Sequence, residues 1–465
     1  MSFSKNQLQI LIIISLCIVI LHLPPATGLD SRSRLGLAVL VFAGGLWITE
    51  AIPLQVTSLL IPVSLTLSGL VDVRAAFAPF SDPVVFLILG SLFLAEALRK
   101  HQLTRRIAMD LLIRCRGNPR LVLLSIMLVA AFTSMWVFST AVVAMLIPVC
   151  MAIASLVEKK HRQQFLQTLL MALVIASTLG ALSTILGASS NAVAIGVLNR
   201  RETWSFLDWM KYGFPLALIL LFVSWLLLIK TVYPTIVKLP AKKFSSELTR
   251  QGNLSRSQKN ILYVLAAAIV FWVGSPIFMD YFPHTSGLAH SALISLIAAA
   301  FLFSGEIITW KDARQINWGV YLIIGAGLSL ANGLQVSGVS DWFAVFINYL
   351  SKGLPYPLMA GGLILISAIA SNIINNTTVV AIFAPLLVNS ASGSNLPVSA
   401  LILPMAFGAT FGFFLPSAST RMALIYTTGE ISTKQMIKIG AIVTIPLVVL
   451  TMLYFYFLSL TGWLY

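Results

Sequence analysis

The sequence predicts an all-α integral membrane protein with about eleven transmembrane helices and two re-entrant hairpins, arranged in two inverted repeats. Three observations lead to this prediction. Hydrophobic residues make up 58% of the 465 residues and charged residues 10%, and the mean hydropathy is +0.94, which is typical of a chain surrounded by lipid. Apolar runs long enough to cross a bilayer recur along the chain. Two polar-interrupted apolar segments also carry near-copies of one motif.

The apolar segments, taken in order, define the expected elements. Continuous apolar runs lie at about 8–23, 35–51, 54–71, 82–98, 212–230, 258–279, 286–304, 319–335 and 439–463. Segments interrupted by polar residues lie at 119–157, 165–199, 357–393 and 397–430. We expect the segments at 119–157 and 357–393 to be the re-entrant hairpins, each of which enters and leaves the membrane on one side.

An internal repeat relates the two expected hairpins. Thr140-Ala-Val-Val-Ala-Met-Leu-Ile-Pro148 recurs 237 residues later as Thr377-Thr-Val-Val-Ala-Ile-Phe-Ala-Pro385. Upstream, Val85-Phe-Leu-Ile-Leu-Gly90 resembles Val320-Tyr-Leu-Ile-Ile-Gly325 at an offset of 235. We therefore expect the following division of the chain: a first transmembrane helix in 1–30, a first repeat at 31–232, a cytoplasmic linker at 233–257 and a second repeat at 258–465.

The distribution of positive charge predicts the topology. A net charge of +15 would suit a nucleic-acid partner, but the basic residues collect in a few connecting loops and not on one face, so no such partner is expected. With a cytoplasmic N-terminus, 22 of the 30 Lys and Arg residues fall on the cytoplasmic side and seven outside. This requires hairpin 119–157 to enter from the cytoplasm and hairpin 357–393 from outside. We expect a multi-pass protein of the plasma (inner) membrane.

The first apolar segment has a second interpretation. Lys5, the apolar run Leu8–Ile20 and Ala26-Thr-Gly resemble a secretory signal peptide with a small-residue cleavage site. We favour a retained first span, because its removal would start the next helix on the wrong side for the charge distribution. The three cysteines are scattered along the chain and predict neither a disulfide framework nor a metal site.

Polar side chains occur midway through both expected hairpins. They are Ser134, Ser139 and Thr140 in the first, and Ser371, Asn372, Asn375, Asn376 and Thr377 in the second. Unsatisfied polar groups in lipid cost several kcal/mol, so these groups must face protein or water. A hairpin tip offers free carbonyls to a cation and free amides to an anion. Thr140 and Thr377 precede helical runs, where a hydroxyl caps a helix. Alternatively, these groups only bridge helices.

A second polar interruption follows each hairpin. The two stretches are Gly187-Ala-Ser-Ser-Asn191 and Leu415-Pro-Ser-Ala-Ser-Thr-Arg421, and both look like breaks in a spanning helix. Matching broken helices in two halves of a chain indicate the binding site of a transporter, because their termini point at substrate and coupling ion. We expect one site built from four elements, two from each repeat.

These motifs resemble the divalent anion/sodium symporter family, whose members carry dicarboxylates, tricarboxylates or sulfate. The resemblance covers nearly the whole chain. It rests on Trp47-Ile-Thr-Glu-Ala-Ile-Pro53, Asp82-Pro-Val-Val-Phe-Leu-Ile-Leu-Gly90, Ser134-Met-Trp136 and the two Thr-x-Val-Val-Ala-x-x-x-Pro hairpin arms. It implies sodium-coupled symport of a dicarboxylate or sulfate, a homodimer and an elevator-like moving domain.

The chain departs from the family pattern at the expected site. Family members typically carry Ser-Asn-Thr at each hairpin tip, which aligns here with Phe138-Ser139-Thr140 and Asn375-Asn376-Thr377. Their Pro-Pro-Asn breaks align with Ser189-Ser190-Asn191 and Thr420-Arg421-Met422. Phe138 lacks a hydroxyl that family members offer to the first sodium site, which leaves the sodium stoichiometry and the sodium dependence open.

By position, the resemblance implies two sodium sites and one anion site. One sodium site would draw on Ser134, Ser139 and the backbone near Gly187, and the other on Ser371, Asn376 and the backbone near Ala418. Substrate contacts are implied for Ser139, Thr140, Ser189, Asn376, Thr377 and Ser419. The resemblance also implies sodium as the coupling ion, and no other cofactor is expected.

Arg421 is a further candidate for substrate binding. The charge distribution places it at membrane depth, where an unpaired guanidinium costs about 3 kcal/mol or more and needs an anionic partner. That partner is the substrate or Glu430, unless Arg421 caps carbonyls at the broken helix end. Bidentate contact would favour a compact dianion such as sulfate.

Other functions find less support in the sequence. The chain has no His/Glu metal spacing, no Ser-His-Asp set and no phosphate-cradling Gly-rich loop, so we expect neither an enzyme nor an ATP-driven pump. Glu96 is expected to pair with Arg99 or Lys100, which favours a structural role over proton coupling. A sodium-independent exchanger or a proton-coupled carrier of the same fold stays open, and an anion channel is the more remote alternative.

Overall fold

The computed structural model describes residues 4–22, 24, 29–231, 253–281, 290–390 and 396–463, and these form helices joined by short connections without any β-strand. Ala26-Thr-Gly and most of the predicted linker at 233–257 lie outside the described residues. The helices before the linker are α1 (Lys5–Leu21), α2 (Ser31–Thr49), α3 (Leu54–Leu67), α4 (Val73–Phe77), α5 (Pro83–Lys100), α6 (Leu103–Arg114), α7 (Pro119–Trp136), α8 (Ser139–Ser155), α9 (Lys159–Leu182), α10 (Ser189–Leu198) and α11 (Phe206–Thr231).

The helices after the linker complete the all-α fold that the sequence predicts. They are α13 (Arg256–Tyr281), α14 (Ser291–Ser304), α15 (Trp310–Ala313), α16 (Trp318–Val336), α17 (Val339–Ser351), α18 (Tyr356–Ile373), α19 (Asn376–Leu387), α20 (Ser399–Gly408), α21 (Thr420–Tyr426) and α22 (Thr433–Leu460). Short 3₁₀ helices occur at Ala78–Ser81 and Pro416–Ala418.

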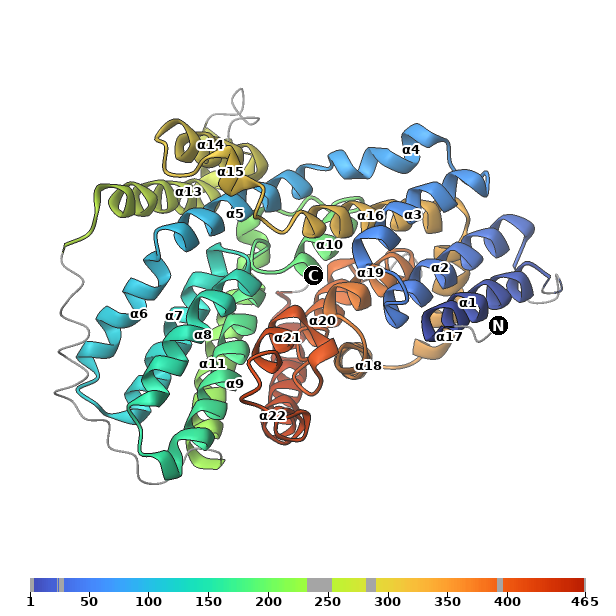
Figure 1. The fold of residues 1–465 in the computed structure, drawn as a ribbon. Helices are drawn as coiled ribbons and strands as arrows, with labels where there is room; N and C mark the ends of the chain where they lie inside the picture. Colours follow the sequence, from blue (N-terminus) through green and yellow to red (C-terminus); the bar gives the residue numbers. More distant parts are fainter. Residues whose placement is uncertain are drawn as a thin grey trace.

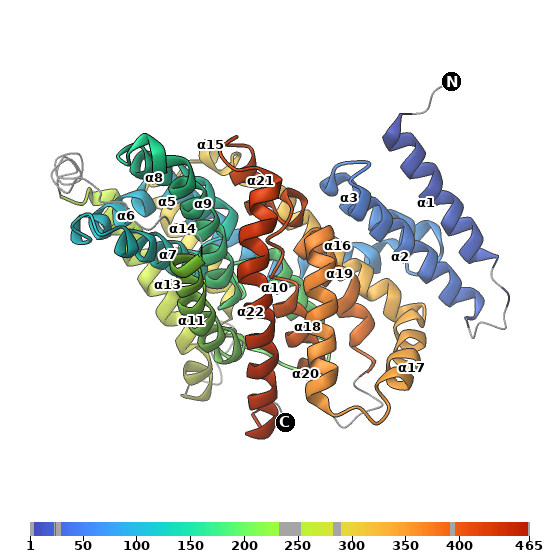
Figure 2. The ribbon, with the colours of Figure 1, turned by 90° about the horizontal axis from the view of Figure 1, so that it is seen from below.

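The helices form an elongated assembly with two distinct ends. Helices α7, α8, α9 and α11 lie side by side at one end, and α1, α2, α3 and α17 lie at the other (Figure 1). The long helices α18 and α22 pack against each other between the two ends, as the view from below shows (Figure 2). The stretch from Phe165 in α9 to Leu198 at the end of α10 is buried throughout, and so is α20.

Eight of the described helices are long and apolar enough to cross a bilayer, or nine if α4 with the following 3₁₀ turn and α5 form one span bent by 42°. Seven shorter apolar helices accompany them in the described residues. Many large apolar side chains on these helices are exposed, for example Phe222, Val270 and Phe301, as expected for surfaces that contact lipid. The predicted number of about eleven spans and the inverted repeats stay predictions.

Both expected hairpins form a helix, a two-residue break and a second helix. Val137 and Phe138 separate α7 from α8, and Ile374 and Asn375 separate α18 from α19. The backbone angles of the two breaks are nearly the same: φ −134° and ψ 144° at Val137 compare with −126° and 162° at Ile374. The motif that recurs in the sequence therefore corresponds to a recurring local structure.

The expected helix caps are wrong by two residues. Thr140 and Thr377 are each the second residue of a helix and not its cap, because α8 begins at Ser139 and α19 at Asn376. The side chain of Asn375 caps α19 by accepting from the backbone N–H of Thr377 at 3.0 Å. Phe138 occupies the equivalent position and offers no oxygen, so α8 has no side-chain cap.

Two amphipathic helices are absent from the predicted elements. Helix α6 lies in the basic stretch that follows α5 and buries Leu103, Ala108 and Leu112. Helix α17 exposes Val345, Phe346 and Tyr349 and buries Ala344 on its other face. Neither is apolar enough to read as a span, but both carry a helical spacing of apolar residues that could have revealed them.

Charged residues near helix ends pair as the sequence predicts. Arg99 donates to both carboxylate oxygens of Glu96 at 2.6 and 2.7 Å, which supports a structural role for Glu96. Lys100 pairs with Asp312 at 2.8 Å and thereby links the end of α5 to α15. This lysine, with the Thr309 amide and hydroxyl, lowers the pKa of Asp312 to about 2. Asp82 caps α5 by accepting from Val84 N–H at 2.9 Å.

Glycine allows the closest helix contact beside the first hairpin. Gly180 lies in α9, and a Cβ atom there would overlap the backbone carbonyl of Ala131 in α7. The contact fixes α9 against the first arm of the hairpin, and α9 leads directly into the first expected helix break. The distance between these helices therefore sets where the break meets the hairpin tip.

We expect Gly180→Ala to lower the stability of the purified protein by about 1–3 kcal/mol, because backbone atoms cannot move aside for the methyl group. Thermal unfolding in detergent measures the change. Gly362→Ala in α18 is the matched control, since no atom lies within 4 Å of the added Cβ. Equal effects of the two substitutions would show that the α7–α9 contact is not tight.

Candidate functional site

The two helix breaks that follow the hairpins interrupt the α-helical backbone, and the second contains the 3₁₀ turn Pro416–Ala418. The first spans 183–188, between α9 and α10, and the second spans 409–419, between α20 and α21. The second break begins earlier than predicted and ends before Thr420. Ser419 ends it by capping α21, because its hydroxyl accepts from Met422 N–H at 3.3 Å. Thr420 and Arg421 are therefore the first residues of a helix.

The first break meets the tip of the second hairpin. Ser189 is the first residue of α10, and its hydroxyl is hydrogen-bonded to the hydroxyl of Thr377 in α19 at 2.7 Å. Both side chains are buried. Helices α10 and α19 pack along each other around this contact. Two residues that the sequence assigns to the substrate site thus lie together.

The second break meets the tip of the first hairpin in the same manner. Arg421 in α21 donates from Nη1 to the hydroxyl of Ser139, the first residue of α8, at 2.6 Å. Arg421 is 6% exposed and Ser139 is 1% exposed. Each hairpin tip therefore contacts a helix that starts at the break of the other half of the chain. That all four elements form one site stays a prediction.

The charge of Arg421 is not compensated by an acidic side chain in the described part of the chain. The three ion pairs found there involve other residues. Glu430 is not its partner, although the sequence offered this pairing as one explanation. Arg421 Nε is buried and makes no hydrogen bond. A buried guanidinium in this position attracts an anion, since an isolated charge at membrane depth is costly.

The start of α8 adds to the positive potential beside Arg421. The N-terminus of a helix carries a partial positive charge, which a capping oxygen normally offsets. Phe138 supplies no such oxygen. The guanidinium and the uncapped helix end together form an environment suited to an anion.

Three residues assigned to the second sodium site converge around Gly412. A Cβ atom built there would lie 2.6 Å from the carbonyl oxygen of Ser371, 2.8 Å from Asn376 Oδ1 and 3.1 Å from the Ala418 Cβ. Asn376 Oδ1 is buried and has no hydrogen-bond partner. An unpartnered oxygen beside a backbone carbonyl fits a hard monovalent cation.

The residues assigned to the first sodium site are partly engaged with other groups. The Ser139 hydroxyl accepts from Arg421, and the Gly187 carbonyl accepts from Ser139 N–H at 3.0 Å. Ser134 Oγ is buried without a hydrogen-bond partner. This donor set fits a sodium ion less well than the set around Gly412. Thr140 lies in the first turn of α8 and is half-buried.

Comparison with known proteins identifies the family. The family model described as "Sodium:sulfate symporter transmembrane region" matches residues 4–463 of this chain. The chain belongs to this family. The resemblance that the sequence motifs indicate is thereby confirmed, and membership in a symporter family indicates a transporter with several membrane spans.

Proteins similar to this chain include an uncharacterized transporter and a sodium-dependent dicarboxylate transporter. An uncharacterized transporter of Haemophilus influenzae is 28% identical over 466 residues, which cover 98% of each chain. The sodium-dependent dicarboxylate transporter SdcS of Staphylococcus saprophyticus is 28% identical and matches 98% of this chain and 92% of its own. The YdaH transporter of Alcanivorax borkumensis has a similar fold, with a TM-score of 0.61, 12% identity and coverage of 98% and 99%.

Two asparagines that the family resemblance does not assign hold the breaks in place. Asn372 accepts from the Phe413 and Phe414 amides at 3.0 and 2.9 Å, and it donates to the carbonyls of Ala368 and Phe411 at 2.7 and 3.1 Å. Asn191 donates to the carbonyls of Ala181 and Thr184, both at 2.8 Å. The available sequence signals were the position of Asn191 in the first predicted break and that of Asn372 among the polar residues of the second expected hairpin.

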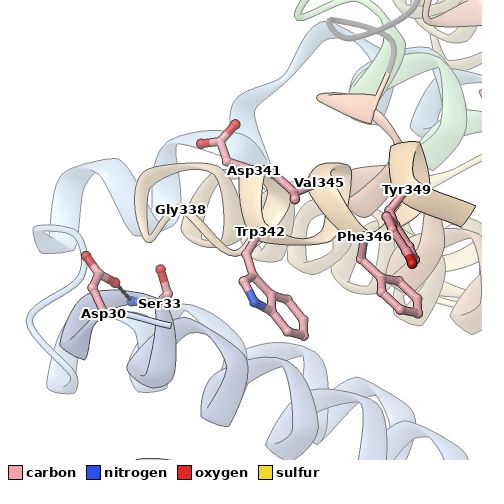
Figure 3. Close-up of a pocket in the computed structure, with 8 residues that line it drawn as sticks. All are labelled: Asp30, Ser33, Gly338, Asp341, Trp342, Val345, Phe346 and Tyr349. Atoms are coloured by element: carbon pink, nitrogen blue, oxygen red, sulfur yellow. Dashed lines mark hydrogen bonds between the residues drawn. The ribbon is translucent and has the colours of Figure 1, made fainter. Parts of the chain in front are cut away.

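A separate open groove of about 800 Å³ lies between the start of α2 and helix α17 (Figure 3). Its polar end holds Asp30, which accepts from Ser33 N–H at 2.6 Å, and its apolar wall includes Phe346 and Tyr349. None of its lining residues belongs to a hairpin tip or a helix break. We therefore do not assign this groove to the family's transport site.

The contact between α10 and α19 can be tested by cross-linking. In a variant with serine in place of Cys17, Cys115 and Cys150, we expect Ser189→Cys with Thr377→Cys to form a disulfide on mild oxidation. The two native hydroxyl oxygens lie 2.7 Å apart, so sulfur atoms at the same positions would start close to each other. Mass spectrometry of the digested protein detects the bond. Each single cysteine serves as a control, and failure to cross-link would contradict the pairing.

Proposed function

We propose that this chain is a secondary active transporter that couples sodium entry to the symport of a divalent anion, either a dicarboxylate or sulfate. The observation that carries the proposal is the buried Arg421, which has no acidic partner in the described residues and contacts the uncapped start of α8. The description of the family supports sulfate and sodium. The printed name of the Staphylococcus saprophyticus relative supports a dicarboxylate and sodium.

The anion is held between the two hairpin tips and the two breaks. Its proposed contacts are the side chains of Ser139, Thr140, Ser189, Asn376, Thr377, Ser419 and Arg421. Arg421 has five N–H donors in a planar arrangement, and only one hydrogen bond, to Ser139, is formed by its Nη1. The remaining donors can bind two oxygens of one anion at once. This geometry favours a compact dianion such as sulfate.

Sodium binding provides the driving force. The proposed ligands are Ser134, Ser139 and the backbone near Gly187 at one tip, and Ser371, Asn376 and the backbone near Ala418 at the other. A sodium ion at the second set would satisfy Asn376 Oδ1, which otherwise remains buried without a partner. Because cation and anion share Asn376, binding of each favours binding of the other.

Transport proceeds by an elevator-like alternation in which the tips and breaks move together. The reciprocal contacts of α8 with α21 and of α10 with α19 support movement as one body. A homodimer in the plasma (inner) membrane, with the N-terminus in the cytoplasm, is part of the proposal. The alternatives are sodium-independent exchange, proton coupling and, more remotely, an anion channel.

Uptake into proteoliposomes tests the proposal directly. Purified protein is reconstituted and offered radiolabelled sulfate, succinate and citrate, with a sodium gradient and with potassium in its place. Symport predicts saturable uptake that requires sodium. Uptake that needs only an internal anion would indicate an exchanger, a requirement for a proton gradient would indicate proton coupling, and non-saturable flux without counterflow would indicate a channel.

Two substitutions test which tip holds the sodium ion more tightly. We expect Asn376→Ala to abolish sodium-stimulated uptake, because it removes the unpartnered oxygen beside Ser371. Ser134→Ala should weaken sodium stimulation less, since the other oxygens of its set are already engaged. Initial uptake rates at graded sodium concentrations measure both effects. Small and equal effects would show that sodium binds elsewhere.

A third substitution tests the anion contact. Arg421→Gln should raise the anion concentration at half-maximal uptake about 10- to 100-fold, because a charge-assisted hydrogen bond contributes about 1.5–3 kcal/mol. Arg200→Gln is the control, since this half-buried arginine donates to the Leu328 carbonyl, and neither residue belongs to the proposed site. Unchanged anion affinity in the Arg421 variant would leave Arg421 as a structural residue.

A further inference from the structure

The two hairpin tips have similar backbones but differ in what covers their first helical residue. Ser139 begins α8 and Asn376 begins α19, so the two residues occupy equivalent positions. The Asn376 side-chain oxygen is buried without a hydrogen-bond partner. The Ser139 oxygen is covered by the guanidinium of Arg421 at 2.6 Å. One tip thus offers an oxygen to a cation, and the other already holds a cation that the chain supplies.

We propose that Arg421 takes the place of one of the two coupling sodium ions, so that this transporter moves a single sodium ion with each anion. This inference rests on the proposed sodium-coupled symport and concerns its stoichiometry. A guanidinium is a permanent monovalent cation, and it donates to hydroxyl and carbonyl oxygens of the kind that coordinate sodium.

The surroundings of Arg421 agree with the role of a fixed cation. No carboxylate in the described residues lies within ion-pair distance of it, so its charge remains available to the transported anion. The Gly187 carbonyl beside the first tip accepts from Ser139 N–H, so one of its two lone pairs is engaged, and Ser134 Oγ is the buried oxygen without a partner there. Phe138 adds no oxygen to this tip. The first tip therefore already contains a positive charge, which disfavours binding of a second cation.

The second tip retains the features of a cation site. Ser371 O and Asn376 Oδ1 converge where Gly412 leaves room, and no arginine or lysine contacts them among the described residues. The second tip therefore binds an exchangeable cation, and the first tip contains a permanent one.

A fixed cation changes the charge of the loaded site. Arg421, one sodium ion and a dianion sum to zero, so the fully loaded site crosses the membrane without net charge. The empty site retains the single positive charge of Arg421. Moving one charge through the membrane potential involves about 2.3 kcal/mol per 100 mV, so the return of the empty site is the voltage-sensitive step.

The decisive experiment measures sodium and anion uptake in the same proteoliposomes. Radioactive sodium and radiolabelled sulfate, or succinate if its uptake is faster, are followed in parallel at early times, with protein-free vesicles as the blank. We expect one sodium ion per anion. Two or more sodium ions per anion in the unaltered protein would overturn the proposal, while leaving sodium-coupled symport intact.

Variants of Arg421 provide a second test of the proposal. We expect the Hill coefficient for sodium to be about 1 in the unaltered protein and in Arg421→Lys, and to rise toward about 2 in Arg421→Gln, because neutralisation opens the first tip to sodium. Arg200→Gln, which removes an arginine outside the site, should leave the coefficient unchanged. If Arg421→Gln lowers the anion affinity but leaves the Hill coefficient unchanged, Arg421 is only a substrate ligand. That result would overturn the proposal that Arg421 replaces a sodium ion.

A binding measurement separates this proposal from the proposed function. Sodium-dependent thermal stabilisation in detergent reports ion binding without any transport. If no anion in the panel is transported, the symport proposal fails, but the steepness of stabilisation with sodium still compares the unaltered protein with Arg421→Gln. A steeper dependence in the variant supports a fixed cation, and identical curves overturn it.

Discussion

Within a membrane, every backbone amide and carbonyl outside a helix must find a hydrogen-bond partner inside the protein. The proposed site depends on how this chain supplies those partners. Four segments leave the helical conformation near the centre of the molecule. Asn375 and Ser419 each bond an amide at the start of a helix. Asn372 and Asn191 bridge from helical segments to the backbone of the breaks, and the Thr184 hydroxyl donates to the Met135 carbonyl. Among the buried polar atoms left without a partner, Ser134 Oγ, Asn376 Oδ1 and Arg421 Nε belong to the proposed site.

The two hairpin tips differ in the charged group beside them. At the second tip the unpartnered group is an acceptor, Asn376 Oδ1, which suits a cation. At the first tip Ser134 Oγ is also unpartnered, but the unpartnered donor Arg421 Nε belongs to a guanidinium, which suits an anion. A backbone that recurs almost unchanged thus supports two different chemistries, because side chains at equivalent positions have diverged. The repeated sequence motif therefore determines the backbone conformation of the two tips, whereas differences at single positions determine which ion or anion each tip can bind.

The sequence predicts the positions of the helices and of the hairpin breaks well, because the length of an apolar run and a recurring motif can both be read from neighbouring residues. The continuous expected spans coincide with helices to within about six residues, and both hairpins break beside the Ser and Asn residues that interrupt the apolar runs. Caps were harder to place, since Ser139 N–H finds its partner in the distant Gly187 carbonyl and lets α8 begin early. The contact of Arg421 with Ser139 joins residues 282 positions apart and depends on how the two halves pack. Helix α17 was missed because its 13 residues are too few to cross a bilayer, which was the criterion for an expected element.

The reciprocal contacts between tips and breaks have a consequence for biogenesis. A ribosome adds about 5–20 residues per second, so the Ser139 hydroxyl waits on the order of tens of seconds after synthesis before Arg421 exists to donate to it. During this interval the first hairpin is inserted without the charged group that covers its tip. Water or a neighbouring protein must shelter the polar tip until the last helices arrive. Neither half of the chain carries a complete site, and a prematurely terminated chain would expose an unfinished one to the bilayer.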